Sequence, residues 1–141
     1  MLIGEYSHSI DAKGRLIIPS KFRLDLGESF VLSVGLDGCL ELRSEKEWEA
    51  YCAFLLAKNP AKTRALQRTV FSQSEKCEAD SQGRFVIPSR FREYAGLTRD
   101  VVAVGVSNKA EIWDKDKWES YKQSEILSPE EFAAAMEDIE M

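Results

Sequence analysis

A thirteen-residue phrase occurs twice in this chain, as DAKGRLIIPSKFR at residues 11–23 and as DSQGRFVIPSRFR at residues 80–92. Each copy places an aspartate four residues before an arginine and a glycine directly before that arginine. Asp and Gly favour a tight turn, because Asp accepts hydrogen bonds from nearby backbone amides and Gly tolerates positive φ. The planar guanidinium of arginine suits a phosphate or the edge of a guanine base. Each phrase therefore combines a turn with a group that can recognise nucleic acid.

Both phrases carry an excess of positive charge. Bases outnumber acids by four to one in the first copy and by three to one in the second. A glycine-turned loop would lift the arginine clear of the surface while the aspartate holds it in place. The residues that this reasoning selects for DNA contact are Asp11, Lys13, Arg15, Arg23, Asp80, Arg84, Arg90 and Arg92. The alternative is that each aspartate–arginine pair is an ion pair internal to its loop, which stabilises the turn and contacts nothing else.

The residue types that enzymes need are scarce in this chain. His8 is the one histidine, and spacing suggests neither a Ser-His-acid nor a Cys-His arrangement. Asp11 and Asp80 do not qualify as general acids, because the arginine four residues after each would keep it ionised. The three cysteines are not spaced as CxxC, and the glycine motifs of nucleotide-binding loops are missing. We therefore expect no catalytic activity, no metal, no cofactor and no small-molecule substrate.

Length and composition are typical of a soluble globular protein. The chain has 141 residues, of which 44% are apolar and 30% charged, and no apolar run approaches the roughly 18 residues of a membrane span. The first residues lack the basic start and long apolar stretch of a secretion signal, so we expect a cytoplasmic protein. The net charge of −5 is uneven, because residues 111–141 carry −7 and residues 1–110 carry +2.

The repetition extends well beyond the thirteen-residue phrase. An offset of 70 aligns Val31, Gly35, Trp48 and Tyr51 with Val101, Gly105, Trp118 and Tyr121. A repeat of this kind implies one structural unit used twice. The chain therefore divides into a first module at residues 4–52, a linker and basic helical stretch at 53–71, a second module at 72–122 and an acidic C-terminal helix at 123–141.

Each module is expected to contain the same elements in the same order. A short β-rich run follows the turn, and Pro19 or Pro88 ends it and opens a short helix with proline at its first position. Two apolar runs on either side of DG or SN then predict a hairpin. A second helix follows, which begins with a capping box at Ser44 and with a weaker cap at Asp114.

Two segments outside the modules have opposite charge. The stretch KNPAKTRALQR, residues 58–68, predicts a proline-marked linker and a basic helix that either touches DNA or is a solvated helix face. The segment from residue 128 to residue 141 predicts an acidic helix with Phe132, Met136 and Ile139 on one face. Docking on the body of the protein, binding to a neighbour and fraying all stay open for this helix.

Neither module is large enough to build a hydrophobic core alone. Two such units combine most simply by pairing their strands around a pseudo-twofold axis, which also removes exposed strand edges. The predicted fold is therefore α+β and mainly β, with one small pseudo-twofold β-barrel and peripheral helices.

The doubled DxxGRxxIPSxFR pattern resembles the MraZ family of bacterial transcriptional regulators, whose modules belong to the AbrB-like (SpoVT-AbrB) group. The resemblance runs from MLIGEYSHSIDAKGR to Tyr121 and so covers nearly the whole chain. It implies two swapped-hairpin modules per chain and assembly of the chains into a ring-like homo-oligomer. It also implies binding to double-stranded DNA at short G-rich direct repeats ahead of the division and cell-wall gene cluster, association with the nucleoid, and repression of the protein's own operon.

The family motif falls on four residues that are all intact here, Asp11, Arg15, Asp80 and Arg84. The resemblance implies that the two arginines contact guanine edges while flanking bases neutralise phosphates. Gln82 stands where the first copy has Lys13, so the two loops are expected to contribute unequally. The acidic C-terminal helix is expected away from DNA, at an edge or a subunit contact.

Two rival functions fit parts of the sequence. A protein-interaction module would use the acidic tail helix as its recognition element, and its binding would be insensitive to salt and to Arg15. An antitoxin, a role known for relatives of the AbrB group, would neutralise a toxin through its tail. The two-module chain and the lack of a long disordered tail weigh against the antitoxin.

Overall fold

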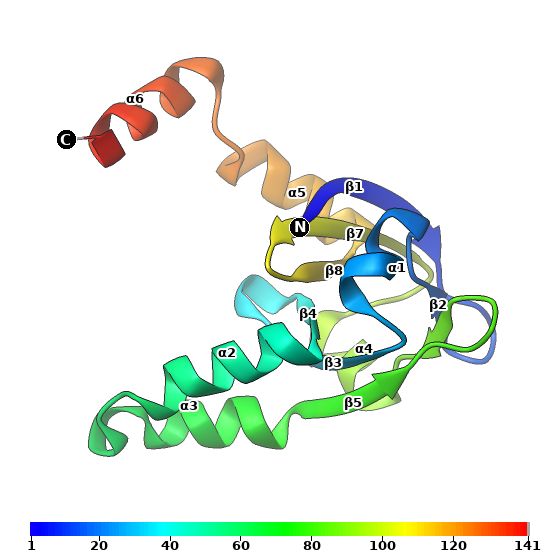
Figure 1. Ribbon diagram of the computed structural model, residues 1–141. Coiled ribbons are helices and arrows are strands. Elements are labelled where there is room, and N and C mark those ends of the chain that lie inside the picture. The colour runs from blue at the N-terminus through cyan, green and yellow to red at the C-terminus, as the bar shows by residue number, and fades with distance from the viewer. Residues whose placement is uncertain (141) are drawn as a thin grey trace.

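The computed structural model describes residues 1–140 (Figure 1). The first repeat forms β1 (Leu2–Ser9), β2 (Arg15–Ile17), α1 (Ser20–Leu26), β3 (Ser29–Val34), the short 3-10 helix η1 (Leu36–Gly38), β4 (Leu40–Ser44) and α2 (Glu45–Leu56). Helix α3 (Pro60–Ser72) follows. The second repeat forms β5 (Ser74–Glu78), β6 (Arg84–Val86), α4 (Ser89–Ala95), β7 (Asp100–Ser107), β8 (Ala110–Asp114) and α5 (Lys115–Glu125), and α6 (Pro129–Glu140) comes last. The predicted α+β class is confirmed.

Six of the strands form one antiparallel sheet in the order β1-β7-β8-β4-β3-β5. Each repeat gives its first strand to the hairpin of the other, since β1 pairs with β7 and β5 pairs with β3. The predicted hairpins, β3–β4 and β7–β8, are confirmed and join through β4 and β8. If each strand is replaced by the equivalent strand of the other repeat, the strand order reads the same from the opposite edge of the sheet. The repeats are therefore interleaved.

The sheet does not close into the barrel that the sequence predicts. Strands β1 and β5 are its two edges, and closure would require a hydrogen-bonded ladder between them. The two strands that could bridge those edges, β2 and β6, pair instead with each other in a separate antiparallel ribbon. The sheet therefore stays open.

The two repeats share one hydrophobic core. Phe30 of the first repeat packs edge to face against Phe85 of the second, with ring centroids 5.1 Å apart. Phe22 and Phe91, the phenylalanines of the two phrases, are both buried in the same cluster. Since residues of each repeat complete the core of the other, neither repeat has to bury enough apolar surface by itself.

The helices begin near the predicted residues, with one difference. Ser44 caps α2 and Asp114 caps α5, each by accepting a hydrogen bond from the backbone N–H three residues further on, at 3.2 and 3.3 Å. Pro19 and Pro88 are the N-cap residues of α1 and α4 and not their first helical residues, because their ψ angles of 134° and 151° are extended.

Two helical segments project from the body (Figure 1). Helix α2 continues to Leu56, beyond the predicted end of the first module, and Asn59 caps α3, so the predicted linker shortens to residues 57–59. Helices α2 and α3 form a hairpin in which Trp48 packs against Phe71. Helix α6 stands apart from this hairpin and has no buried residue. Within residues 1–140, no helix combines the length and the apolar composition that crossing a membrane requires.

Candidate nucleic-acid interface

One carboxylate fixes the loop between β1 and β2. Asp11 Oδ1 accepts hydrogen bonds from the backbone N–H groups of Lys13 and Arg15, each at 2.9 Å. Asp11 Oδ2 accepts a third from Arg15 Nε at 2.7 Å. Gly14 completes the turn with a φ of 77°, a conformation that would strain a residue with a side chain. The aspartate therefore shapes the loop and orients the arginine at the same time.

The loop between β5 and β6 repeats this geometry. Asp80 accepts hydrogen bonds from the backbone N–H groups of Gln82 and Arg84 at 2.9 Å and from Arg84 Nε at 2.8 Å. The side chains of Arg15 and Arg84 are 27% and 26% exposed. Because the aspartate engages only Nε, each guanidinium keeps its two terminal nitrogens for a ligand.

Hydrogen bonding keeps both aspartates ionised. The backbone N–H of Arg15 holds the pKa of Asp11 below its ordinary value, and the side chain and charge of the same arginine act in the same direction. The pKa of Asp80 is lowered in the same way by Arg84. At neutral pH each carboxylate therefore remains an acceptor for its arginine.

The antiparallel ribbon of β2 and β6 connects the two loops, one at each of its ends. Its antiparallel register pairs Arg15 with Val86 and Ile17 with Arg84. Residues that pair across two strands point to the same side, and so do residues two positions apart along one strand. These four side chains therefore share one face. The residues between them are buried in the core. We call this outward surface the ribbon face.

Ile17 and Val86 are candidate functional residues that the sequence reasoning missed. They are 41% and 54% exposed, although isoleucine and valine are among the most often buried residue types. The signal was available in LII and FVI, since side chains of a strand alternate between its two sides. Ile17 and Val86 each lie two positions after an exposed arginine, so each points to the same side of the ribbon as that arginine.

Arg23 and Arg92 hold the loop of the other repeat, and we call them the bracing arginines. Arg23 Nη2 donates a hydrogen bond to the carbonyl of Gln82 at 3.4 Å, and its guanidinium lies directly against Gly83. Arg92 occupies the equivalent place against Gly14. Each is also anchored from Nε to a backbone carbonyl of its own repeat, at 3.2 and 3.0 Å. Arg23 therefore supports the second loop through a hydrogen bond and close contact, and Arg92 lies against the first loop without a hydrogen bond to it.

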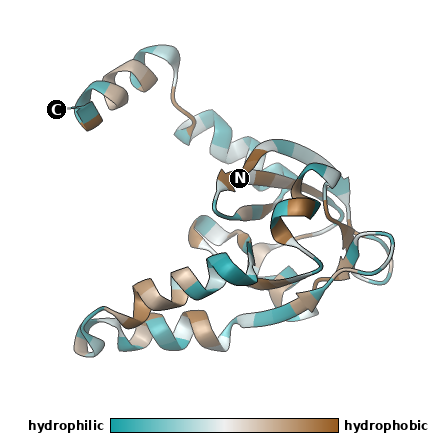
Figure 2. Ribbon diagram, viewed as in Figure 1, coloured by the Kyte–Doolittle hydropathy of each residue, from teal (hydrophilic) through white to brown (hydrophobic). Residues whose placement is uncertain are grey.

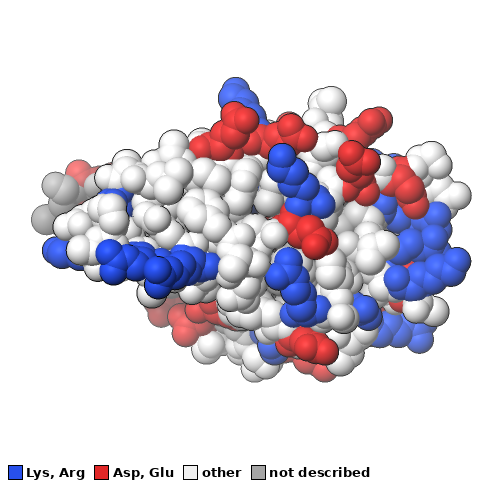
Figure 3. Space-filling model, turned by 90° about the horizontal axis from the view of Figure 1, so that it is seen from below, with Lys and Arg blue, Asp and Glu red and all other residues white. Residues whose placement is uncertain are grey.

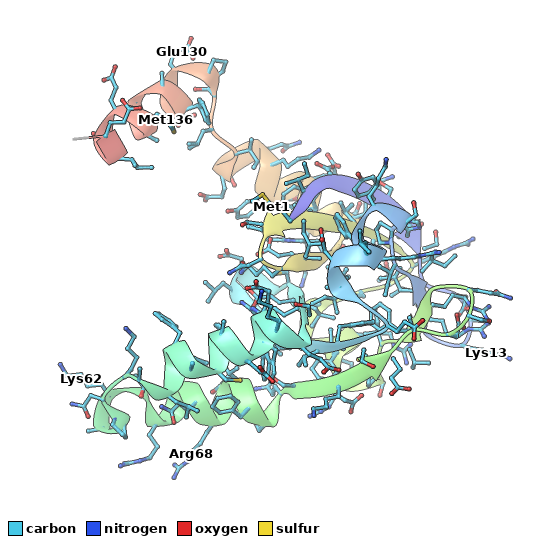
Figure 4. All side chains as sticks on the ribbon, in the orientation of Figure 1. Met1, Lys13, Lys62, Arg68, Glu130 and Met136 are labelled. Carbon is cyan, nitrogen blue, oxygen red and sulfur yellow. The ribbon has the colours of Figure 1, made fainter. Side chains whose placement is uncertain are left out.

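The remaining candidates, Lys13 and Arg90, lie in different surroundings. Lys13 is exposed on the first loop (Figure 4). Arg90 donates a hydrogen bond to the carbonyl of Ser72 at 3.1 Å and approaches Glu75 to 3.8 Å, so it links α4 to the start of the second repeat. Figure 3 shows Lys and Arg side chains gathered at the end of the molecule that carries the loops.

The basic stretch of α3 forms a second, separate surface. Figure 4 places Lys62 and Arg68 at the opposite end of the molecule from Lys13. Figure 3 shows a row of basic side chains along this helical hairpin, well removed from the loops. A duplex that lies on the ribbon face would therefore not meet α3 of the same chain.

One group of possible metal ligands lies away from the loops. Cys39, Glu41 and Glu111 have ligand atoms within 4.8 Å of one another. Two bases already pair with these carboxylates: Lys109 Nζ lies 2.6 Å from Glu41 and 3.5 Å from Glu111, and Arg43 Nη1 lies 2.7 Å from Glu41. Burial raises the pKa of the Cys39 thiol, which disfavours the thiolate that a metal binds. This group is best described as a buried ion-pair network.

Known proteins resemble this chain along its whole length. The family model described as "MraZ protein, putative antitoxin-like" matches residues 1–69 and again residues 70–139. A protein of Acetivibrio thermocellus called Transcriptional regulator MraZ is 51% identical over 96% of both chains. Proteins of the same name are 48% identical in Pelotomaculum thermopropionicum, over 100% of this chain and 99% of that protein, and 52% identical in Lachnoclostridium phytofermentans, over 85% and 86%. Two matches to one family model and this level of identity show that the chain belongs to the MraZ family.

Proposed function

We propose that this protein is a sequence-specific DNA-binding transcriptional regulator. It represses its own operon in the division and cell-wall gene cluster through repeated G-rich operator sites. The observation that carries this proposal is the ribbon face, on which two preformed loops hold Arg15 and Arg84 at diagonal positions on the same side of the ribbon. The names of its relatives agree with such a role. Its place of action is the nucleoid, in the cytoplasm.

The ribbon face suits the major groove of DNA, which admits a two-stranded β-ribbon. Arg15 and Arg84 each keep two terminal nitrogens that the aspartate does not engage. A bidentate contact of these nitrogens with guanine contributes about 1–3 kcal/mol of discrimination against other bases. Ile17 and Val86 present methyl groups beside them, which suits thymine methyls and the edges of the groove. G-rich sites are therefore the preferred ligand.

The other basic residues divide into two roles. Lys13 neutralises a phosphate from its exposed position on the loop, and Gln82 at the same place in the second loop does not, so the loops contribute unequally. The bracing arginines Arg23 and Arg92 act mainly by holding the loops in shape. Arg90 contributes a more distant positive charge.

The two repeats act as AbrB-like modules related by a pseudo-twofold axis, at residues 4–52 and 72–122. The strand order supports such an axis, because it reverses when the repeats are exchanged. One ribbon face per chain gives weak binding. A ring-like homo-oligomer presents several faces to operator direct repeats, and the raised effective concentration turns modest single contacts into useful affinity.

Fluorescence anisotropy on the DNA upstream of the protein's own gene tests this function. We expect the wild type to bind with a steep dependence on salt, because contacts to phosphates release counterions. Arg15→Ala with Arg84→Ala should lose preference for that DNA over a scrambled duplex. Arg15→Lys with Arg84→Lys keeps the charge but loses the planar fork, so it should lose the sequence preference while retaining salt-dependent binding.

Lys46→Ala with Lys115→Ala is the matched control. Both lysines are exposed in the first turns of α2 and α5, and the pair removes the same charge as the double arginine variant. The control should keep the wild-type preference. Equal binding by the wild type and the double arginine variant would mean that the loops are architecture only, and the function would then have to be sought in the tail or in a protein partner.

A further inference from the structure

The apolar side of α6 has no partner in its own chain. Phe132, Met136 and Ile139 lie at spacings of four and three residues and so share one face. They are 60%, 42% and 78% exposed, and no residue of α6 is buried. Figure 2 shows hydrophobic residues on this isolated helix. A twelve-residue helix is marginal in water by itself, because most helical stability in proteins comes from packing of an apolar face.

The other side of α6 is strongly acidic, and a capping box fixes where the helix begins. Residues 129–140 contain five acids and no base. A reciprocal capping box starts the helix, in which Glu131 accepts a hydrogen bond from the backbone N–H of Ser128 at 3.0 Å and Ser128 Oγ accepts one from the backbone N–H of Glu131 at 3.2 Å. The sequence thus specifies a helix with one apolar face and acidic flanks.

The hairpin of α2 and α3 carries a complementary surface. Arg64, Arg68 and Phe71 line a shallow groove on α3, together with two polar residues. Phe54 and Leu66 add exposed apolar surface to the same hairpin. Residues 60–72 contain three bases and no acid. Figure 3 shows a row of basic side chains beside uncharged surface along the hairpin. The charge pattern of this groove is the opposite of that of α6.

Helices α3 and α6 are also equivalent elements of the two repeats. Each follows the second helix of its repeat after a short connection, and each begins with a polar cap and a proline, Asn59–Pro60 and Ser128–Pro129. Helix α3 folds back on α2 through Phe71, whereas α6 stands away from both α5 and the hairpin (Figure 1). A segment that is docked in one repeat and undocked in the other is free to dock on another molecule.

We propose that α6 of one subunit docks on the α2–α3 hairpin of a neighbouring copy of this chain. Phe132 and Met136 enter the groove beside Phe71, and the acidic flanks of α6 face Arg64 and Arg68. The contact joins two different surfaces, so it is head-to-tail and generates a ring when the rotation closes. This inference rests on the assembly proposed above and specifies its subunit contact, but it does not require that DNA is the ligand.

Two full-length variants test the contact by sedimentation velocity. Phe132→Ala with Met136→Ala removes the apolar face of α6 but leaves the groove. Arg64→Glu with Arg68→Glu reverses the charge of the groove but leaves α6. All four side chains are exposed, so neither variant disturbs the core. Lys76→Glu with Lys115→Glu is the control, since it reverses two exposed charges outside the α2–α3 hairpin and α6.

We expect the wild type and the control to sediment as an oligomer and each test variant to sediment near the 16.0 kDa monomer. Mixed at high concentration, the two test variants should form a complex of one copy of each, because one supplies an intact α6 and the other an intact groove. A monomeric wild type, a test variant that keeps the wild-type mass, or a mixture that stays monomeric would overturn the proposal.

Binding to a duplex with a single operator site separates this inference from the proposed function. Both test variants keep the ribbon face, so their affinity for one site should stay within a few-fold of the wild type. Their affinity for a duplex with several repeats should fall, because linked contacts are lost. Normal single-site binding by the two test variants with unchanged assembly would reject only the contact. Equal single-site preference of the wild type and the Arg15→Ala with Arg84→Ala variant, with assembly lost in both test variants, would reject only the proposed function.

Discussion

Alanine at the two turn glycines gives a matched test of the bracing arginines. Gly14 and Gly83 have φ angles of 77° and 76°, so alanine at either position incurs the same backbone strain, roughly 1–2 kcal/mol. They differ in what a new Cβ meets. At Gly14 it would lie 3.4 Å from Arg92 Cζ, which is ordinary contact, but at Gly83 it would lie 2.4 Å from Arg23 Cζ.

The size of the difference follows from the bonds that Arg23 makes. Nonbonded carbon atoms prefer about 3.5–4.0 Å, so the guanidinium must withdraw by about 1 Å when Gly83 becomes alanine. Its hydrogen bond to the carbonyl of Gln82 is already 3.4 Å long and would be lost. A hydrogen bond contributes about 0.5–1.5 kcal/mol net. We therefore expect Gly83→Ala to cost about 1 kcal/mol more than Gly14→Ala in the free energy of unfolding.

Thermal unfolding at one fixed protein concentration measures this difference, because the proposed assembly would make Tm depend on concentration. A double-mutant cycle with Arg23→Ala isolates the contact. In the Arg23→Ala background, Gly83→Ala should cost only the strain that Gly14→Ala shows. Equal losses at the two glycines, together with additive effects of Gly83→Ala and Arg23→Ala, would refute the bracing role.

Further predictions concern ionisation and salt. NMR titration should show that Asp11 and Asp80 ionise below their ordinary pKa of 3.8. The stability that these ionised carboxylates contribute is therefore complete above pH 3.8 and is lost as the pH falls through the lowered pKa. Loop hydrogen bonds that weaken between about pH 8 and pH 5 would contradict this assignment. Burial raises the pKa of the Cys39 thiol, and it raises the pKa of the Cys77 thiol to about 11. Neither thiol should therefore react with a thiol reagent at about pH 8 while the protein is folded. Rapid labelling at that pH would show that the core opens. Lys13→Ala should reduce the slope of log affinity against log salt by about one for each loop on DNA, and an unchanged slope would mean that Lys13 touches no phosphate.

The loops could be predicted from the sequence because their determinants are local. Aspartate, glycine and arginine lie within five residues, and the carboxylate meets the backbone of its own turn. The caps at Ser44 and Asp114 are local in the same way. Interactions of this range depend little on the rest of the fold, so residue types and spacing suffice to define them.

The bracing arginines and the open sheet could not be predicted in this way. Arg23 meets Gln82 across 59 positions of the chain, and that contact exists only because the two repeats interleave. A charge count selects Arg23 and Arg92 for DNA contact alongside Arg15 but contains no information about their contacts with the loops. The barrel was expected because closure removes strand edges, but β2 and β6 satisfy their hydrogen bonds in the ribbon that carries the loops.

Divergence of the two repeats explains why one chain would carry both halves of a subunit contact. If α3 and α6 had kept the same charge, equivalent surfaces would repel each other, and any contact between identical surfaces would pair two chains and stop at a dimer. A basic α3 and an acidic α6 instead favour a head-to-tail contact, in which every chain both gives and receives a helix. The ribbon face stays outside this contact, because the loops lie at the other end of the molecule from the α2–α3 hairpin (Figure 4). In the proposed arrangement, the two similar copies of the phrase would bind DNA and the divergent helices α3 and α6 would mediate assembly.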